Sequence, residues 1–332
     1  MRIRLSVPLL AALLLSFSGM ASAGSGEKVK TLRPMPDKAD ECFRDVNLKF
    51  LKGTTRLFVP QTRVSFVTRA KYKARHGGSM AKGGPSVEMA VILNGMSDED
   101  FQAIADKVEA EYVNRLQEAG FEVVPADQFT AAKGYQKLTE KPKTTGVEEK
   151  FGFWDGKSYG ATHHKTFTAA GRPSFGDLGG TMAGGELTNL AKLAGDLKAT
   201  AAYIDYVVDF TTFTVEKETD YKRWTDYSRP GGPVDVSETI KTIELEAVPG
   251  LHLAQTSGFA DIGFVTPKYQ PAGLQQNGSW TEASQFLVSA EKNEDEDLVL
   301  TVDPVAFQEA VVRLASRNIA LGVQLIQAGA KK

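Results

Sequence analysis

Apolar residues recur at helical spacing most clearly between residues 98 and 119. Ser97 precedes this run at an N-cap position, and Gly120 follows it where a C′ glycine ends a helix. The acidic triplet Asp98 to Asp100 complements the dipole of the first turn, so capping explains it better than a metal site. The predicted apolar face consists of Phe101, Ile104, Ala105, Val108, Tyr112 and Leu116.

Strand patterns flank this helix. Residues 55–74 and 200–221 alternate between apolar and polar positions, whereas 86–97 form an apolar run typical of a buried strand. Residues 121–124 predict a short strand after the helix, which gives a strand–helix–strand order. Asp205 and Asp209 share one face of their strand. They lie about 13 Å apart along it, so they indicate a polar sheet face rather than a glycosidase pair.

The C-terminal part predicts antiparallel strands and then a long helix. Turn residues at 230–233 and 249–250 separate strands, and residues 266–279 are interpreted as a polar loop. Asp303 and Pro304 begin the helix. Its apolar stripe is wide enough to need a sheet or another subunit against it. Phe307, Val311 and Leu314 are expected to cover the sheet. The candidates for contact with another chain are Ile319, Val323 and Ile326, with burial in the core as the alternative.

The first residues are typical of a secretory signal peptide. Two arginines precede an apolar run from Leu5 to Phe17, and Ala21-Ser22-Ala23 forms a small-x-small cleavage site. Cleavage between Ala23 and Gly24 predicts a periplasmic or secreted protein of 332 − 23 = 309 residues. A flexible leader over 24–40 is expected next, followed by a single α/β domain over 41–332.

Charge and cysteine content restrict the partners. The 37 lysines and arginines after cleavage and the 41 acidic residues give 37 − 41 = −4, which argues against nucleic acid and anionic lipid as main partners. No apolar run after the signal approaches membrane length. Cys42 is the only cysteine and cannot form an intramolecular disulfide. A buried apolar role is favoured for it over a reactive thiol.

The glycine-rich stretch 177–195 raises the question of phosphate binding. Gly180 and Gly185 have the spacing of a Walker loop, but Glu186 stands where that loop carries lysine. The stretch therefore predicts a flexible connection into a helix whose apolar face contains Leu187, Leu190, Ala191 and Ala194. A small anion at the start of that helix remains an alternative.

Residues 126–176 lack clear periodicity and are interpreted as a long loop insertion, a kind of segment that often carries function. Trp154, His163 and His164 lie within it. The two histidines are candidates for metal ligands. Neighbouring side chains on a strand diverge, so such a site needs further ligands. Asp155, or one of Glu148 and Glu149, completes such a set only if the fold brings it near.

The order of elements resembles a known group of envelope proteins. Residues 120–124, "GFEVV", follow the long helix, and residues 206–209, "YVVD", form the centre of the later strand. In these features the chain resembles the periplasmic α/β domain of the curli secretion pore subunit. It is similar also to the amino-terminal domain of the Tol system's β-propeller protein. The resemblance covers roughly residues 87–125 and 186–328. The chain departs from the pore subunit in lacking a lipoprotein cysteine and an obvious pore-forming hairpin.

These patterns predict an α/β (α+β) fold, a mixed sheet with flanking helices in an anticodon-binding-like layered domain. The resemblance implies envelope assembly or protein interaction. The sequence shows no H-E-x-x-H motif. The favoured function is therefore non-catalytic binding of a protein or envelope component in the cell envelope, with no cofactor and with a protein partner or a homo-oligomer. The alternative is an exported hydrolase or metal-binding enzyme whose site surrounds Trp154, His163 and His164.

Overall fold

The computed structural model of the protein describes residues 33–75, 86–140, 145–154, 158–175, 184–224, 235–254, 260–282 and 285–331. The predicted signal peptide and its cleavage site lie outside these ranges. The leader expected over 24–40 is described only from Arg33, and its last part already belongs to the fold. Residues Arg33–Pro34 form a strand, β1, that pairs in parallel with residues 280–281.

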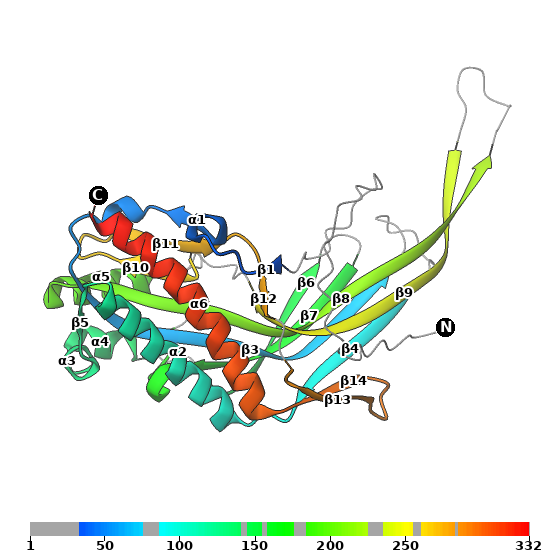
Figure 1. Ribbon diagram of the computed structural model, residues 1–332, viewed down its shortest axis with the longest axis horizontal. Coiled ribbons are helices and arrows are strands. Elements are labelled where there is room, and N and C mark those ends of the chain that lie inside the picture. The colour runs from blue at the N-terminus through cyan, green and yellow to red at the C-terminus, as the bar shows by residue number, and fades with distance from the viewer. Residues whose placement is uncertain are drawn as a thin grey trace, which may run out of the picture.

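The described strands join one mixed sheet, which the helices flank (Figure 1). The strand β3 is parallel to β8 and antiparallel to β4, and β14 is parallel to β4. This confirms the predicted α/β character. The long strands are β3 (Arg56–Arg75), β4 (Ser86–Asn94), β7 (Ser158–Thr168), β8 (Thr200–Trp224) and β9 (Asp235–Ala254). The shorter strands are β2 (Phe43–Val46), β5 (Glu122–Val124), β6 (Glu148–Trp154), β10 (Ile262–Val265), β11 (Pro271–Gln276), β12 (Trp280–Glu282), β13 (Leu287–Lys292) and β14 (Leu298–Val302).

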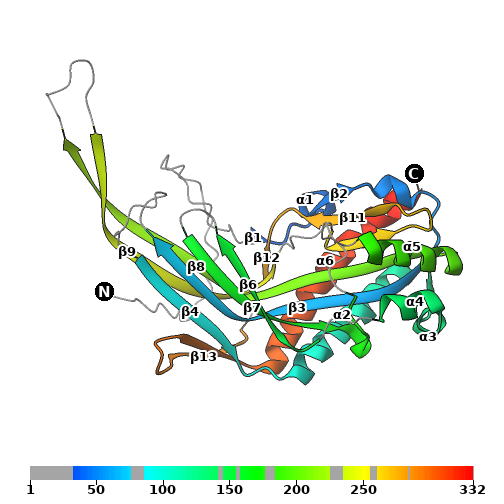
Figure 2. The same cartoon turned by 180° about the vertical axis from the view of Figure 1, so that it is seen from behind.

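Helices cover both faces of one half of the sheet (Figures 1 and 2). Successive side chains of a strand point to opposite faces, so β8 contributes to two cores. Ile204 and Tyr206 pack in the core on the side of α2 and α6, whereas Ala201 and Tyr203 pack in the core on the side of α3, α4 and α5. The helical segments are α1 (Ala39–Cys42), η1 (Leu48–Leu51), α2 (Asp98–Glu118), α3 (Ala126–Thr130), α4 (Lys133–Leu138), η2 (Ala169–Gly171), α5 (Gly184–Leu197) and α6 (Pro304–Lys331).

The helix α2 confirms its prediction at both ends and along its face. Ser97 and Asp100 form a capping box in which each side chain bonds the backbone N–H of the other residue. Gly120 has a φ of +90°, a left-handed conformation that favours glycine. All six residues of the predicted apolar face are buried. The preceding and following strands both pair with β3, but β4 does so antiparallel and β5 parallel.

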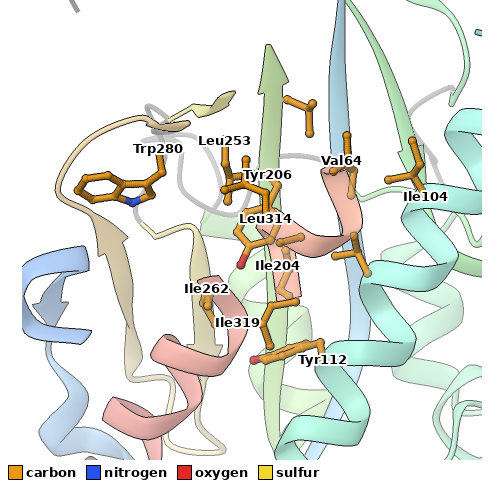
Figure 3. Close-up of a cluster of buried hydrophobic side chains, with 14 of the residues drawn as sticks. Val64, Ile104, Tyr112, Ile204, Tyr206, Leu253, Ile262, Trp280, Leu314 and Ile319 are labelled. Carbon is orange, nitrogen blue, oxygen red and sulfur yellow. The ribbon is translucent and has the colours of Figure 1, made fainter. Parts of the chain in front are cut away.

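The predicted start of α6 is confirmed, but the interface assigned to it is corrected. The Asp303 carboxylate accepts a hydrogen bond from the backbone N–H of Ala306 at 2.8 Å. Ile319, Val323 and Ile326 are all buried in the core of this same chain, so they are not available as a partner surface. Figure 3 shows Ile319 within the cluster that contains Ile262 of β10. The alternative expectation, that these three residues are buried in the core, is therefore the correct one.

Three segments differ from the sequence expectation. The interval 126–176 is not a loop insertion, since it contains α3, α4 and the antiparallel pair β6–β7. The interval 266–279 is not only a loop, because β11 within it is a largely buried strand paired with both β10 and β2. The turn expected at Pro249-Gly250 lies inside β9, at an irregularity of the β8–β9 register. None of the described helices combines the length and apolar character that crossing a bilayer requires.

Candidate functional site

Three antiparallel strand pairs extend from the helix-covered half of the molecule toward the same end (Figures 1 and 2). They are β3–β4, β6–β7 and β8–β9. The helices α2, α5 and α6 lie over the other half of the sheet. This end therefore presents β structure that no described helix covers, and we take it as the candidate functional site.

The pair β8–β9 projects furthest. The strand β8 pairs with β3 as far as Val208, opposite Phe66, and with β9 as far as Trp224, opposite Asp235. Within the described residues, positions 212–224 and 235–248 pair only with each other, and we call them the ribbon. At about 3.3 Å per residue, positions 212–224 extend roughly 40 Å. The ribbon is therefore a long two-stranded element with two open edges.

An irregularity in the strand pairing marks the point where the ribbon leaves the sheet. The register shifts between Asp209, opposite His252, and Thr211, opposite Pro249. The Asp209 carboxylate accepts hydrogen bonds from the backbone N–H groups of Phe210, at 2.7 Å, and Thr211, at 3.3 Å. Such irregularities bend strands and increase their twist. Asp209 thus stabilises a backbone bend, which gives this aspartate a structural role.

A small apolar cluster fixes the root of the ribbon to β3 and β4. The rings of Tyr72 and Phe213 stack with centroids 5.4 Å apart and planes 15° from parallel. Val87 and Leu245 are buried in the same cluster, and Met89 packs against them. Aromatic stacking of this kind adds about 0.5–1.5 kcal/mol beyond the burial of area. The root is therefore held in place where the ribbon begins.

Charged side chains link β3 to its neighbours near the root. The Glu88 carboxylate pairs with Lys71 and, at 3.3 Å, with Lys73. The hydrogen bond from Lys71 is the main cause that lowers the pKa of Glu88. Arg69 pairs with Asp297 at 2.7 Å, which connects β3 to the turn between β13 and β14. These contacts stabilise the position of β3 and β4. Each of the two carboxylates is paired with a lysine or an arginine, so the pair does not form a site of converging acidic groups.

His163 lies on β7 beside a carboxylate and a hydroxyl. Its Nδ1 is 3.0 Å from Oε2 of Glu148, and Thr68 donates a hydrogen bond to Oε1 of the same carboxylate at 2.6 Å. Thr68 is the extra residue of a bulge, since Val67 pairs with His164 and Arg69 with His163. The Thr68 hydrogen bond is the largest cause that lowers the pKa of Glu148, and the His163 hydrogen bond adds to it.

The order of these three groups differs from that of a nucleophilic triad. In such a triad the imidazole lies between the hydroxyl and the carboxylate, so that it can take the hydroxyl proton. Here the Glu148 carboxylate lies between Thr68 and His163. The imidazole therefore has no direct contact through which to activate the hydroxyl. The arrangement joins the edge strand β6 to β3 and β7.

His164 does not share these contacts. Its Nε2 lies 2.6 Å from the hydroxyl of Thr162, on the same strand. Asp155 and the side chain of Trp154 lie outside what the structure describes. Across the described ranges, no three His, Cys, Asp or Glu side chains gather closely enough to hold a metal ion.

Two further sequence candidates have structural partners. Asp205 is buried and forms a two-contact ion pair with Arg63 of β3, one contact measuring 2.9 Å. Cys42 is fully buried, and burial raises the pKa of its thiol to about 12. This agrees with the buried apolar role favoured from the sequence. The stretch 177–183 lies outside the described residues, while Leu190, Ala191 and Ala194 of α5 are buried as predicted.

No protein-family model matches this sequence, and comparisons with curated proteins and with solved structures also find no match. The geometry of the chain is therefore the basis for a functional proposal. Sequence reasoning had predicted both strands of the ribbon but not its length beyond the sheet. The apolar alternation continues beyond the sheet only through Phe213 and Val215. Residues 216–220 are all polar, so the sequence gives no clear signal for the rest of the ribbon.

Proposed function

We propose that this protein is an exported, non-catalytic component of the cell envelope that binds another protein or envelope component through its ribbon. One observation carries the proposal: the ribbon pairs only with itself over positions 212–224 and 235–248 of the described chain. An isolated two-stranded hairpin is marginally stable in water, and a third strand or a packing surface stabilises it. A binding partner supplies such a surface.

The ribbon suits binding by strand addition. Each open edge carries N–H and C=O groups that lack a strand partner, and an extended segment of another chain can bond to them. A second copy of this protein meets the same requirement. Because the root is fixed by Tyr72 and Phe213, the ribbon presents its edges in a defined direction. This reduces the conformational entropy lost on binding.

The cellular location in this proposal rests on the sequence. The apolar run from Leu5 to Phe17 and the site after Ala23 support export to the periplasm or beyond the cell. The resemblance to periplasmic α/β domains of envelope proteins, with an anticodon-binding-like arrangement of layers, supports the same location. These features are part of the proposal together with the binding function.

Shortening the ribbon tests the binding function. Glu216 and Glu244 pair directly, so replacing residues 217–243 by Asn-Gly closes the strands with a two-residue hairpin turn. This variant keeps Phe213 and Leu245 at the root. We expect its thermal melting temperature to stay within a few degrees of that of the full chain. We also expect it to lose the partner, or the homo-oligomer, that the full chain forms.

Photo-crosslinking in intact cells identifies the contact directly. A crosslinking amino acid replaces Thr219 in the ribbon or, as the control, the exposed Gln117 on α2. The proposal expects adducts of defined mass from position 219 and none from 117, and light scattering separates a second copy from another protein. A monomeric full-length protein without adducts at 219, or a shortened variant that keeps its partner, would refute it.

An exported hydrolase or metal-binding enzyme is the second candidate. The contact between His163 and Glu148, at 3.0 Å, is the observation that favours it. Its test is the metal content of protein purified without an affinity tag, measured beside a His163→Ala, His164→Ala variant. Equal metal content in the two proteins excludes a site at these histidines.

A further inference from the structure

A pocket of about 290 Å³ is lined by turns of the chain. These turns lie at the end of the molecule opposite the ribbon (Figure 1). Three connections line it, each leading into a strand of the sheet. They are the segment from η1 into β3 at 50–56, the α5–β8 turn at 198–200 and the β10–β11 turn at 266–270. The volume lies near the lower end of the range for small-molecule sites, roughly 300–1,000 Å³.

The pocket is strongly basic although the whole chain has a formal charge of −2. Its four cations are Lys52, Arg56, Lys198 and Lys268, and none of the described residues that line it is a carboxylate. Arg56 is neutralised by Glu122, whose Oε1 lies 2.9 Å from Nε. This leaves 4 − 1 = 3 positive charges. Within the described chain, the three lysines form no ion pair. The pocket therefore has a local surplus of positive charge although the chain as a whole is slightly negative.

The nearby helix ends do not account for three lysines. The C-termini of α5 and α6 lie close to the pocket, and each carries about half a negative charge. Their sum, about one unit, is smaller than the three lysine charges. The end carbonyls also have partners already, since Arg56 bonds Leu197 O at 2.6 Å and the Gly53 N–H bonds Ala330 O at 3.0 Å.

Lys198 has a backbone conformation that favours glycine. Its φ is +48°, in the left-handed region where glycine is relaxed and a lysine is strained. Its N–H closes the turn by bonding Gly195 O at 3.2 Å, a contact that glycine can also make. The fold alone thus gives no reason for a lysine at this position. Strained residues of this kind cluster at functional sites, and here the side chain supplies one of the three unpaired charges.

Hydrogen-bond donors accompany the charges. The hydroxyls of Thr54 and Thr55 line the pocket beside Lys52, and neither forms a hydrogen bond among the described residues. Lysine ammonium groups bind phosphate as point charges, and hydroxyl groups complete its coordination. Three charges and two hydroxyls suit a group with more than one negative charge in a small volume.

We propose that this pocket binds a small ligand carrying two adjacent phosphate groups, either a free molecule or the headgroup of a lipid. The site is separate from the ribbon, so it does not depend on the function proposed above. A low net charge over the whole surface is compatible with it, because the attraction acts within about 10 Å at ordinary ionic strength.

Inorganic pyrophosphate is the probe for the first experiment, titrated calorimetrically into the whole protein. Two variants are compared with the unmodified chain. One replaces Lys52, Lys198 and Lys268 by Gln, and the matched control replaces Lys107, Lys133 and Lys150, three exposed lysines outside the pocket. Both lose three charges. We expect saturable binding that the pocket variant weakens by at least tenfold and the control leaves within twofold.

A single substitution separates binding from folding. Lys198→Gly relieves the left-handed strain, so we expect an unchanged or higher melting temperature together with weaker pyrophosphate binding. A purely structural lysine would leave pyrophosphate affinity unchanged. Absence of saturable binding to the unmodified chain, equal weakening by the two triple variants, or an unchanged affinity in Lys198→Gly would each overturn the proposal.

Vesicles distinguish the two sources of the ligand. Phosphatidylcholine vesicles with and without a diphosphate-bearing lipid are sedimented with the protein. Cosedimentation that requires the diphosphate lipid and is reversed by pyrophosphate indicates a headgroup. Pyrophosphate binding without cosedimentation indicates a free molecule.

Discussion

The buried hydrogen bonds around Asn318 predict a double variant that is more stable than one of its single variants. Asn318 lies fully buried on α6, and its Oδ1 accepts a hydrogen bond from the Tyr206 hydroxyl at 2.7 Å. Its Nδ2 donates to Oε1 of Gln276 at 3.2 Å and contacts Sγ of Cys42 at 3.6 Å. These bonds connect α6 to β8, β11 and α1 in the middle of the core.

The expected magnitudes follow from counting the groups that lose a partner. A buried polar group without a hydrogen bond costs about 1–3 kcal/mol. Asn318→Leu removes the hydrogen-bond partner of the Tyr206 hydroxyl and that of the Gln276 side-chain carbonyl. We therefore expect the free energy of unfolding to fall by about 2–6 kcal/mol. Tyr206→Phe leaves only Asn318 Oδ1 without a hydrogen-bond donor, so we expect the free energy of unfolding to fall by about 1–3 kcal/mol. In the double variant the tyrosine hydroxyl is absent, so about 1–3 kcal/mol of the Asn318→Leu loss is recovered.

Urea unfolding followed by circular dichroism measures the free energy of unfolding of each variant. Tyr112→Phe is the control, because the buried Tyr112 hydroxyl has no hydrogen-bond partner among the described residues and its removal should cost little. Equal m-values across the set are needed for the comparison. If the losses of Tyr206→Phe and Asn318→Leu simply add in the double variant, the reasoning from these bonds is refuted.

Three further predictions concern the core residue Ile319, the Glu148 carboxylate on β6 and the thiol of Cys42. Ile319→Ala should lower the free energy of unfolding by about 2–5 kcal/mol and leave the mass measured by light scattering unchanged, because Ile319 is fully buried in its own chain; a changed oligomeric state would restore the interface assignment. The Glu148 pKa is lowered in the folded state, so the stability that Glu148 adds is present above its ordinary pKa of 4.5 and is lost as the pH falls through the folded value. Acid titration of Glu148→Gln should therefore show a smaller loss of stability below pH 4.5 than the unmodified chain, and identical acid curves would contradict this. The Cys42 thiol, with a pKa of about 12, should not react with iodoacetamide near pH 8 until urea unfolds the protein, and rapid labelling of folded protein would contradict its burial.

The sequence predicted the elements whose information is local. For α2, the cap, the apolar face and the terminal glycine all lie within 24 residues, and each agrees with the structure. The alternation of β8 likewise assigns Ile204, Tyr206 and Val208 to one core. Both cases rest on a periodicity that the backbone imposes directly.

The elements that sequence reasoning missed depend on partners far along the chain. Residues 266–279, which contain β11, were interpreted as a polar loop; pairing with β10 and β2 makes β11 a strand. The same partners explain α6. A Cβ on Gly322 would lie 2.7 Å from Cδ1 of Ile262, which shows how closely β10 covers the side of the helix that carries Ile319. The pattern gave the width of the stripe correctly but could not identify the surface that covers it.

The candidate site was only partly predictable for a related reason. Its strands follow from alternation, but the end of pairing with β3 at Val208 depends on where β4 joins the sheet. The basic pocket could not be predicted from the sequence, because Lys52, Lys198 and Lys268 are separated by about 70 residues or more and none belongs to a motif. Turns at one end of a mixed sheet bring them together.

The pairing of β2 with β11 has a consequence for the order in which the chain can fold. Val46 pairs with Gly273, and Arg33 pairs with Trp280, so the first described residues find their strand partners only near the end of the chain. Such distant pairings give a high contact order and slow folding. During synthesis, Phe43 and Leu48 stay exposed until α6 has been made, because they belong to the core that this last helix completes. Until then the exposed apolar surface favours aggregation of the incomplete chain.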